Sequence, residues 1–415
     1  MLSSFSALHW SASGVYRTAV TLSFSRLAAS FHTRTNPLYR ERDAMLARSE
    51  PVVDLISGNV TEHGLTYPHA VLESILTDAA RRARVYRPHP LGQPEARAAI
   101  SAYYRSHGLA IPPEQILLTP GTSLAYWYAF LALCDPGDEI LTPRPSYPLF
   151  DEIARIAGVR TVAYRLDESR GWAIDLADLE DRISPRTRAI VLISPHNPTG
   201  AVVSATELDA LAEIATRHAL PIIADEVFSE FLFGLDRLPR PAATRAPLVI
   251  ALNGFSKMFA LPGIKLGWMA LSGDDEWVRP VLSALEAMSD AFLPVNEIVQ
   301  AAVPMIFEEG EEFLGRYRRE IARRTAATLA GLARVSSLTL VPPRGGFYAV
   351  VRVTGSRRDD EEMALHLLRS AGCLVHPGFF YDLDPTHLVL STVSDPAIAE
   401  PAIARIAAAL ANLTA

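Results

Sequence analysis

The chain has 415 residues, a formal net charge of −7 and a sequence pI near 5.9. Its hydrophobic content of 49% and mean hydropathy of +0.15 are typical of a well-packed globular protein and exclude a disordered or fibrous one. The acidic balance argues against a nucleic-acid-binding surface, and no apolar run approaches the roughly 18 residues that a membrane span needs.

The first forty residues differ from the rest of the chain. They contain eight serines and four arginines, and no acidic residue occurs before Glu41. Such a composition resembles a transit peptide, but we favour a mis-assigned start or a disordered tail, and we expect a cytoplasmic protein. We therefore predict that residues 1–40 are an extension. The two cysteines, Cys134 and Cys373, suit neither a disulfide framework nor a metal site, and we expect no metal.

From about Pro112 the chain alternates β-branched runs with helical stretches. This alternation predicts an α/β fold with a mostly parallel, seven-stranded sheet covered by helices on both faces, and we assign residues 54–290 to this large domain. Ligands of such a sheet collect at the loops that leave the carboxyl ends of the strands. The predicted strands are residues 115–120, 138–143, 160–166, 188–195, 221–228, 247–255 and 265–272, and the clearest helices are 123–133, 148–157 and 205–218.

Beyond Leu271 the pattern changes. A long helical stretch, from about residue 275 to 333, is broken near Pro294 and Gly310. Short strands, a helix near 360–371 and a terminal helix at 397–413 follow. This mixed order predicts a smaller α+β domain over residues 291–415, with residues 41–53 packing on it.

Only two of the 39 lysines and arginines are lysines, Lys257 and Lys265, which leaves 37 arginines. Lys257 follows the predicted strand 247–255, so it lies at the edge of the sheet where ligands are expected. An amine condenses with a carbonyl to form a Schiff base, whereas a guanidinium cannot. Because this chain uses arginine for nearly every other positive charge, we predict that Lys257 holds an aldehyde cofactor such as pyridoxal phosphate.

An acid for the pyridine nitrogen of that cofactor is also present. Asp225 lies near the end of the apolar run 221–228, where a buried carboxylate is costly unless a cation pairs with it. A pyridinium would be such a partner. For a single aspartate considered alone, a helix N-cap or a surface salt bridge is also a plausible explanation of Asp225.

A phosphate site is indicated between a strand and a helix. Gly121, Thr122 and Ser123 occupy this junction, where backbone N–H groups and hydroxyls bind phosphate. Taken alone the pattern is weak, because a hydroxyl at a helix start is more often only a cap. Tyr147 and Asn197 follow the next strands and offer a flat ring and an amide.

The segments PGTSLA, PSYP, HNPTG, DEVF, SKMFALPGIKLGW and GGFY resemble, in order and spacing, those of the class I/II aminotransferase family of fold-type I pyridoxal-phosphate enzymes. The resemblance extends from about Asp54 to the C-terminus. It implies a homodimer with an active site shared between subunits. The cofactor-binding residues that it implies are Tyr86, Gly121, Thr122, Ser123, Tyr147, Asn197, Asp225, Ser256, Lys257 and Lys265.

The resemblance implies catalytic roles for three of these residues. Lys257 would form the Schiff base and move protons, Asp225 would keep the pyridine nitrogen protonated, and Tyr147 would stack on the ring. Asn197 would donate to the ring oxygen O3′ and contact substrate. Tyr86 would reach the phosphate of the neighbouring subunit.

Other implied contacts concern the phosphate and the substrate. The group Gly121–Ser123 would cradle the phosphate, and Gly58 would lie over the substrate. Lys265 stands where the family usually has an arginine, and we interpret it as a point-charge phosphate ligand.

Two further positions depart from the family pattern. Phe228 replaces a tyrosine that normally donates to O3′, which should leave the pKa of the Schiff base higher. Val389 replaces an arginine that would bind the α-carboxylate of the substrate. Either another group, such as Arg344, holds this carboxylate, or the substrate lacks one there.

The resulting hypothesis is a homodimeric, pyridoxal-phosphate-dependent aminotransferase that moves an amino group between an amino substrate and a 2-oxo acid. No nucleic acid or membrane partner is expected. A lyase, cyclase or decarboxylase on the same scaffold is the alternative, and Val389 makes it more credible. A third hypothesis, a non-catalytic sensor, is disfavoured because no helix-turn-helix pattern precedes the family-like region.

Overall fold

The structure is a computed structural model that describes residues 25–31 and 36–414. It divides into two units, residues 1–35 and 36–415. In the first unit, the described residues form the short helix α1 (Arg26–Ser30), which begins with the Ser25 hydroxyl accepting the Ala28 N–H. Most of the predicted extension lies outside the described residues. Asn36 caps a helix of the second unit, and the boundary of the extension at residue 40 stays a prediction.

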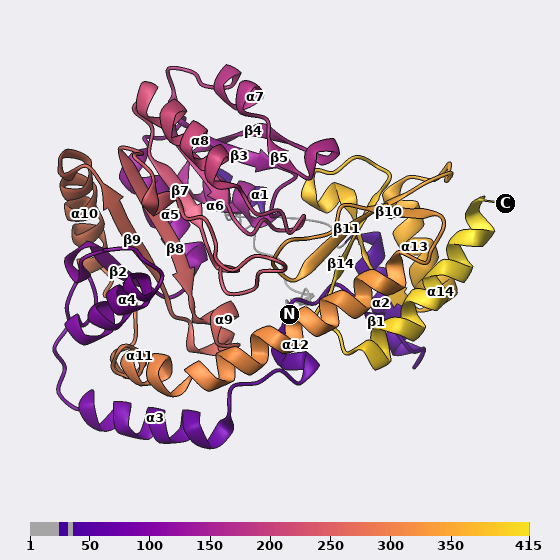
Figure 1. Ribbon diagram of the computed structural model, residues 1–415, viewed down its shortest axis with the longest axis horizontal. Coiled ribbons are helices and arrows are strands. Elements are labelled where there is room, and N and C mark those ends of the chain that lie inside the picture. Colours follow the sequence, from indigo (N-terminus) through magenta and orange to yellow (C-terminus); the bar gives the residue numbers. More distant parts are fainter. Residues whose placement is uncertain (1–24, 32–35, 415) are drawn as a thin grey trace, which may run out of the picture. The chain divides into compact units, whose positions relative to one another are not determined.

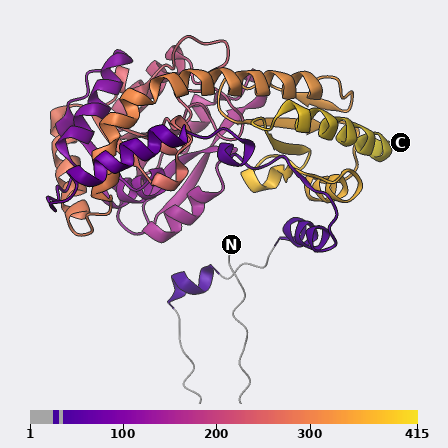
Figure 2. The same ribbon diagram turned by 90° about the horizontal axis from the view of Figure 1, so that it is seen from below.

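The second unit contains helices of very different lengths (Figures 1 and 2). They are α2 (Pro37–Ala47), α3 (His69–Arg82), α4 (Pro94–Ser106), α5 (Thr122–Leu133), α6 (Leu149–Ala157), α7 (Leu176–Asp181), α8 (Ala205–Arg217), α9 (Phe255–Met258), α10 (Asp275–Asp290), α11 (Glu297–Glu309), α12 (Glu311–Leu332), α13 (Asp360–Ala371) and α14 (Pro396–Thr414).

The strands form three sheets. They are β1 (Val53–Asp54), β2 (Ile116–Thr119), β3 (Glu139–Arg144), β4 (Arg160–Asp167), β5 (Ala173–Ile174), β6 (Thr187–Ile193), β7 (Ile222–Asp225), β8 (Leu248–Gly254), β9 (Gly267–Gly273), β10 (Leu338–Leu340), β11 (Tyr348–Val353), β12 (Cys373–Leu374), β13 (His376–Pro377) and β14 (His387–Ser391).

The largest sheet has the order β2-β9-β8-β7-β6-β3-β4-β5. Strands β9 and β5 run opposite to the other six, so the predicted, mostly parallel α/β fold is confirmed. All seven predicted strands are present. The predicted number of strands is wrong by one, since the two-residue strand β5 pairs with the end of β4 and extends the sheet.

Apolar side chains on both faces of this sheet explain its cover of helices. Alternating strand residues, such as Ile223 and Ile250, pack with α5, α6 and α10 on one face. Their neighbours, such as Ile222 and Val249, pack with α7 and α8 on the other face. A sheet buried on both faces needs nearly continuous apolar strands, which is the pattern of β6, β7 and β8.

The C-terminal elements build a second core around the antiparallel sheet β10-β11-β14-β13. Strand β1 pairs with β12, and α2 packs on α13, so residues 41–53 lie against these elements. Helix α12 connects the core beside the large sheet with this second core (Figure 1). Its Tyr317 packs in the former, and its Leu332 packs in the latter. The domain boundaries themselves stay a prediction. Within the described residues, no helix has both the length and the apolar character required to cross a membrane.

Candidate active site

One pocket collects side chains from the carboxyl ends of five strands of the large sheet. Residues that follow β2, β3, β6, β7 and β8 meet there with one residue of β11. This is the edge at which the topology predicts a ligand site. The lining residues are Thr122, Ser123, Tyr126, Tyr147, Phe150, Ile153, Ile193, Asn197, Asp225, Val227, Phe228, Ser256, Lys257 and Tyr348.

Asp225 ends β7 and turns its carboxylate to the pocket wall. Its Oδ2 accepts a hydrogen bond from Tyr126 Oη at 2.9 Å, and its Oδ1 accepts the Val227 N–H at 3.0 Å. Burial raises the pKa of Asp225 to about 6, partly offset by these two donors. Among the described residues no cation pairs with Asp225 directly, so the carboxylate is available to a cationic group of a ligand.

Lys257 lies in the short helix α9, directly after β8. Burial lowers the pKa of its amine, and Asp225 opposes this shift. A lowered pKa increases the neutral, nucleophilic fraction of an amine. The Nζ atom lies 5.9 Å from the ring centroid of Phe228 and 6.0 Å from that of Phe347, so apolar rings surround the reactive nitrogen.

The predicted phosphate cradle forms the N-terminus of α5. Gly121 is its N-cap residue with φ +112°, a conformation that side-chain-bearing residues rarely adopt, and Thr122 and Ser123 open the helix. A Cβ on Gly267 of β9 would lie 3.0 Å from the backbone of Gly121, so strand and cradle are in close contact. Ser256 adds a third hydroxyl to this pocket.

Tyr147 and Asn197 both line the pocket, as predicted from their places after β3 and β6. The Tyr147 side chain is partly accessible, and burial raises its pKa. The Asn197 Oδ1 atom is buried and has no hydrogen-bond partner among the described residues. A bound polar group would satisfy this amide.

Five predicted site residues do not line this pocket, and one of them, Gly121, is the N-cap of α5 described above. Lys265 is exposed and has a left-handed backbone with φ +56°, two residues before the glycine that contacts the cradle. Arg344 is exposed. Tyr86 is 69% exposed in its own chain. Gly58 is nearer, since a Cβ there would lie 2.2 Å from the Tyr348 hydroxyl.

Of the two apolar departures, Phe228 lines the pocket and Val389 does not. The ring of Phe228 packs on Phe347 with centroids 4.9 Å apart. Val389 is buried in β14, opposite Val350, in the apolar cluster to which Tyr348 also packs. Within the described residues, Lys257 is the only lysine or arginine in the pocket wall.

Two polar site residues were missed by sequence reasoning, Tyr126 and Tyr348. Tyr126 lies four residues after Thr122, so helical spacing places it on the same face as the cradle. That spacing could have identified it. Tyr348 belongs to the segment GGFY, for which no role was assigned, and it lines the pocket from the start of β11.

Comparisons with known proteins agree with this arrangement. A family model described as "Aminotransferase class I and II" matches residues 50–406. A glutamate-pyruvate aminotransferase, AlaA, of Escherichia coli is 31% identical over 86% of this chain and 90% of its own length. An aspartate/prephenate aminotransferase of Thermus thermophilus is 30% identical over 79% of this chain and 83% of its own length.

Solved structures give the same result. An alanine aminotransferase from Pyrococcus furiosus superposes with a TM-score of 0.88 at 26% identity, covering 94% of this chain and 100% of that one. A Thermus thermophilus aspartate aminotransferase with maleate has a TM-score of 0.82 at 27% identity, covering 94% and 100%.

Proposed function

Because the chain belongs to the class I and II aminotransferase family, we propose roles for its pocket residues in the transfer of an amino group. The protein is a pyridoxal-phosphate-dependent transaminase that acts on an amino substrate and a 2-oxo acid. The relatives cited above are all named as aminotransferases, and none of them supports the alternative of a lyase, cyclase or decarboxylase. The observation that carries the assignment of roles is the joint presence of Lys257 and Asp225 in one pocket.

The residues present fit this cofactor. A buried amine, a carboxylate without a cationic partner and a helix N-terminus with hydroxyls match its aldehyde, ring nitrogen and phosphate. The side-chain amide nitrogen of Asn197 offers the donor that the ring oxygen needs. Lys257 would hold the aldehyde, Asp225 the ring nitrogen and Asn197 the ring oxygen. Thr122, Ser123 and Ser256 would hold the phosphate.

When bound, pyridoxal phosphate supplies an aldehyde that condenses with amines and a ring that accepts an electron pair released at the substrate Cα. The protein residues make this chemistry selective. Lys257 Nζ, whose pKa is lowered by burial, would take up the proton released at the substrate Cα and pass it on. Asp225, held by Tyr126 and Val227, keeps a negative charge where the ring nitrogen carries a positive one.

A two-stage spectroscopic assay tests this function. The protein loaded with pyridoxal phosphate is given a panel of amino donors, and the cofactor absorbance should convert to that of the aminated form. A 2-oxo acid added afterwards should restore the original spectrum. Conversion without reversal by any 2-oxo acid would contradict transamination, and full turnover by Lys257→Arg would contradict the role of Lys257.

We also propose that the enzyme is a homodimer whose two subunits share each site. Val85, Tyr86 and Phe292 are 60%, 69% and 66% exposed, an unusual exposure for large apolar side chains. Tyr86 lies outside the pocket of its own chain but could reach that of a second copy. Mixed Lys257→Arg and Tyr86→Ala subunits should regain activity that neither variant has alone, and an active monomer would contradict the proposal. The cytoplasmic location is proposed likewise, and cell fractionation tests it.

A further inference from the structure

A second buried carboxylate, Glu226, follows Asp225 directly at the end of β7. Glu226 is 1% exposed, and its partner Arg240, in the loop before β8, is 5% exposed. The two side chains form an ion pair. Glu226 Oε1 has no hydrogen-bond partner among the described residues, so the compensation of this charge depends on Arg240.

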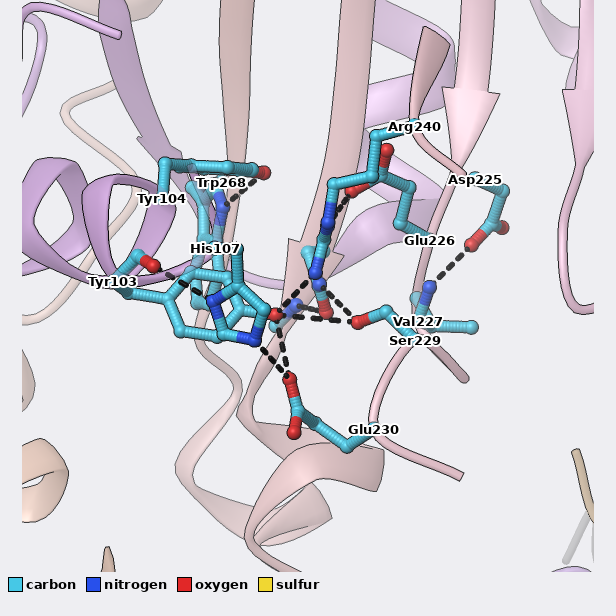
Figure 3. A network of polar contacts seen from close by, with 12 residues as sticks. Tyr103, Tyr104, His107, Asp225, Glu226, Val227, Ser229, Glu230, Arg240 and Trp268 are labelled. Atoms are coloured by element: carbon cyan, nitrogen blue, oxygen red, sulfur yellow. Dashed lines mark hydrogen bonds and ion pairs between the residues drawn. The ribbon is translucent and has the colours of Figure 1, made fainter. Parts of the chain in front are cut away.

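Arg240 is fixed in place by the tyrosines of α4 (Figure 3). Its Nη2 donates to Tyr103 Oη at 2.9 Å, and its guanidinium carbon lies 5.6 Å from the ring centroids of both Tyr103 and Tyr104. Tyr104 Oη in turn accepts a hydrogen bond from Trp268 Nε1 at 3.1 Å. A buried guanidinium held by several groups has one orientation, and that orientation faces Glu226.

The other carboxylate of this cluster, Glu230, has its own partners. Glu230 accepts a hydrogen bond from Tyr103 Oη at 2.8 Å, and it lies 3.5 Å from both His107 Nε2 and Arg318 Nη1. The side chains of Arg318 and His107 are 52% and 34% exposed, so Glu230 is compensated from the surface. Arg240 is thereby left to compensate Glu226.

The two consecutive carboxylates face different surroundings: Asp225 faces the pocket, and Glu226 faces Arg240. Asp225 lines the pocket and binds the Val227 N–H, while Glu226 lies on the Arg240 side (Figure 3). Like charges at adjacent buried positions disfavour ionisation of both. The charged and titratable groups that act on Asp225 are Glu226, Lys257, Tyr126 and Tyr147, and those that act on Glu226 are Arg240, His107 and Tyr104.

We propose that Arg240 is a positioning residue of the active site: by neutralising Glu226, it allows Asp225 to carry the negative charge that faces the cofactor ring. The proposal rests on the proposed role of Asp225. Without Arg240, the two adjacent buried carboxylates would together hold a proton to a higher pH, and the share of that proton on Asp225 would increase. The cofactor would then lose its anionic partner at a higher pH than in the wild type.

The test measures the affinity of the apoprotein for pyridoxal phosphate across the pH range, with no turnover required. Arg240→Met should raise the midpoint of the acidic loss of affinity by about one pH unit. Glu226→Gln, which leaves Arg240 cationic, should lower it. The double variant Glu226→Gln/Arg240→Met removes both charges and should return the midpoint to the wild-type value, and Arg240→Lys should keep it there.

A matched control separates charge compensation from folding. Arg324 of α12 is also buried and pairs with Glu320, but it does not line the pocket. Arg324→Met should lower the thermal stability and leave the midpoint unchanged. An unchanged midpoint in both Arg240→Met and Glu226→Gln, or a double variant that keeps the shift, would overturn the proposal. If Arg240→Met does not fold, Glu226→Gln alone tests the proposal, and its midpoint should move to lower pH. A wild-type protein that binds no pyridoxal phosphate at any pH would instead contradict the proposed function as well.

Discussion

Asp225 has to be both buried and negatively charged, and these two requirements conflict in the protein without cofactor. Its proposed role at the cofactor ring requires a negative charge at the end of a buried strand, but burial raises its pKa to about 6. Because the folded carboxyl keeps its proton to a higher pH than the unfolded one, its stabilising contribution is full below about pH 4 and is lost as the pH rises through about 6. The cationic ring nitrogen of the bound cofactor offsets this loss.

The variant Asp225→Asn tests that statement in the apoprotein. Asparagine carries no charge, so the gain in free energy of unfolding over the wild type should grow from near zero at pH 4 to about 1–3 kcal/mol at pH 7.5. Denaturant unfolding at the two pH values measures the difference. A difference independent of pH would show that Asp225 ionises in the folded protein as readily as in the unfolded one.

Phe228 offers a second test within the pocket. Its ring lies beside Lys257 Nζ and lacks the hydroxyl that a tyrosine would present. Phe228→Tyr should add a donor to the ring oxygen of the cofactor, and a hydrogen bond to a charged form favours that form. The pH midpoint of the cofactor absorbance change should therefore fall by about one unit. No shift, or an upward one, would place the new hydroxyl away from that oxygen.

Val389 bears on the choice of substrate. A guanidinium at this position would bind a carboxylate through two parallel hydrogen bonds, and a buried valine cannot. Val389→Arg should raise kcat/KM for alanine and aspartate by about tenfold or more, in line with the 1.5–3 kcal/mol of a hydrogen bond to a charged group. If the wild type already converts these amino acids with ordinary efficiency, their carboxylate has another partner, and Arg344→Ala becomes the informative variant.

Among individual residues, the sequence predicts those whose chemistry is rare in the chain. Lys257 is conspicuous among 37 arginines, and Asp225 is conspicuous at the end of an apolar run. Tyr126 was not predicted, because an aromatic residue in an apolar helix is more often part of a core. Its hydrogen bond to Asp225 depends on how α5 crosses the strand ends.

Among the elements, β9 and the N-terminus of α5 approach each other closely at the proposed phosphate cradle. A Cβ on Gly267 would lie 3.0 Å from the Gly121 backbone and 3.1 Å from the Asn253 carbonyl oxygen, so backbone would have to move. Gly267→Ala should weaken the affinity for pyridoxal phosphate by about 1–3 kcal/mol, the range for overpacking a tight contact. Gly263→Ala is the matched control, since a Cβ there meets no atom within 4 Å. Equal affinities of the two variants would contradict the account of the cradle.

The elements themselves were largely predictable. The seven main strands and the breaks in the helical stretch near Pro294 and Gly310 follow from apolar runs and from helix-breaking residues. Strand β5 was not predictable, because two residues carry no periodicity and pair only through the turn after β4. The reversed direction of β9 also depends on tertiary pairing with β2 and β8.

For the molecule as a whole, the site depends on segments that are far apart in the sequence. Strand β7 supplies Asp225, α9 supplies Lys257, β11 supplies Tyr348, and the exposed Tyr86 is proposed to serve a second copy. Family membership follows from most of the chain length, since residues 50–406 match. The substrate depends on fewer positions, of which Val389 is the most informative.

The central claim, that Lys257 carries the cofactor, has one direct test. The holoprotein is reduced with borohydride, digested and mapped by mass spectrometry. Since the chain has only two lysines, the reduced cofactor has few amines to which it can be attached. The account predicts the added mass on Lys257 alone, with Lys265 unmodified. Attachment to Lys265, or a reduced holoprotein without any covalent cofactor, would contradict it.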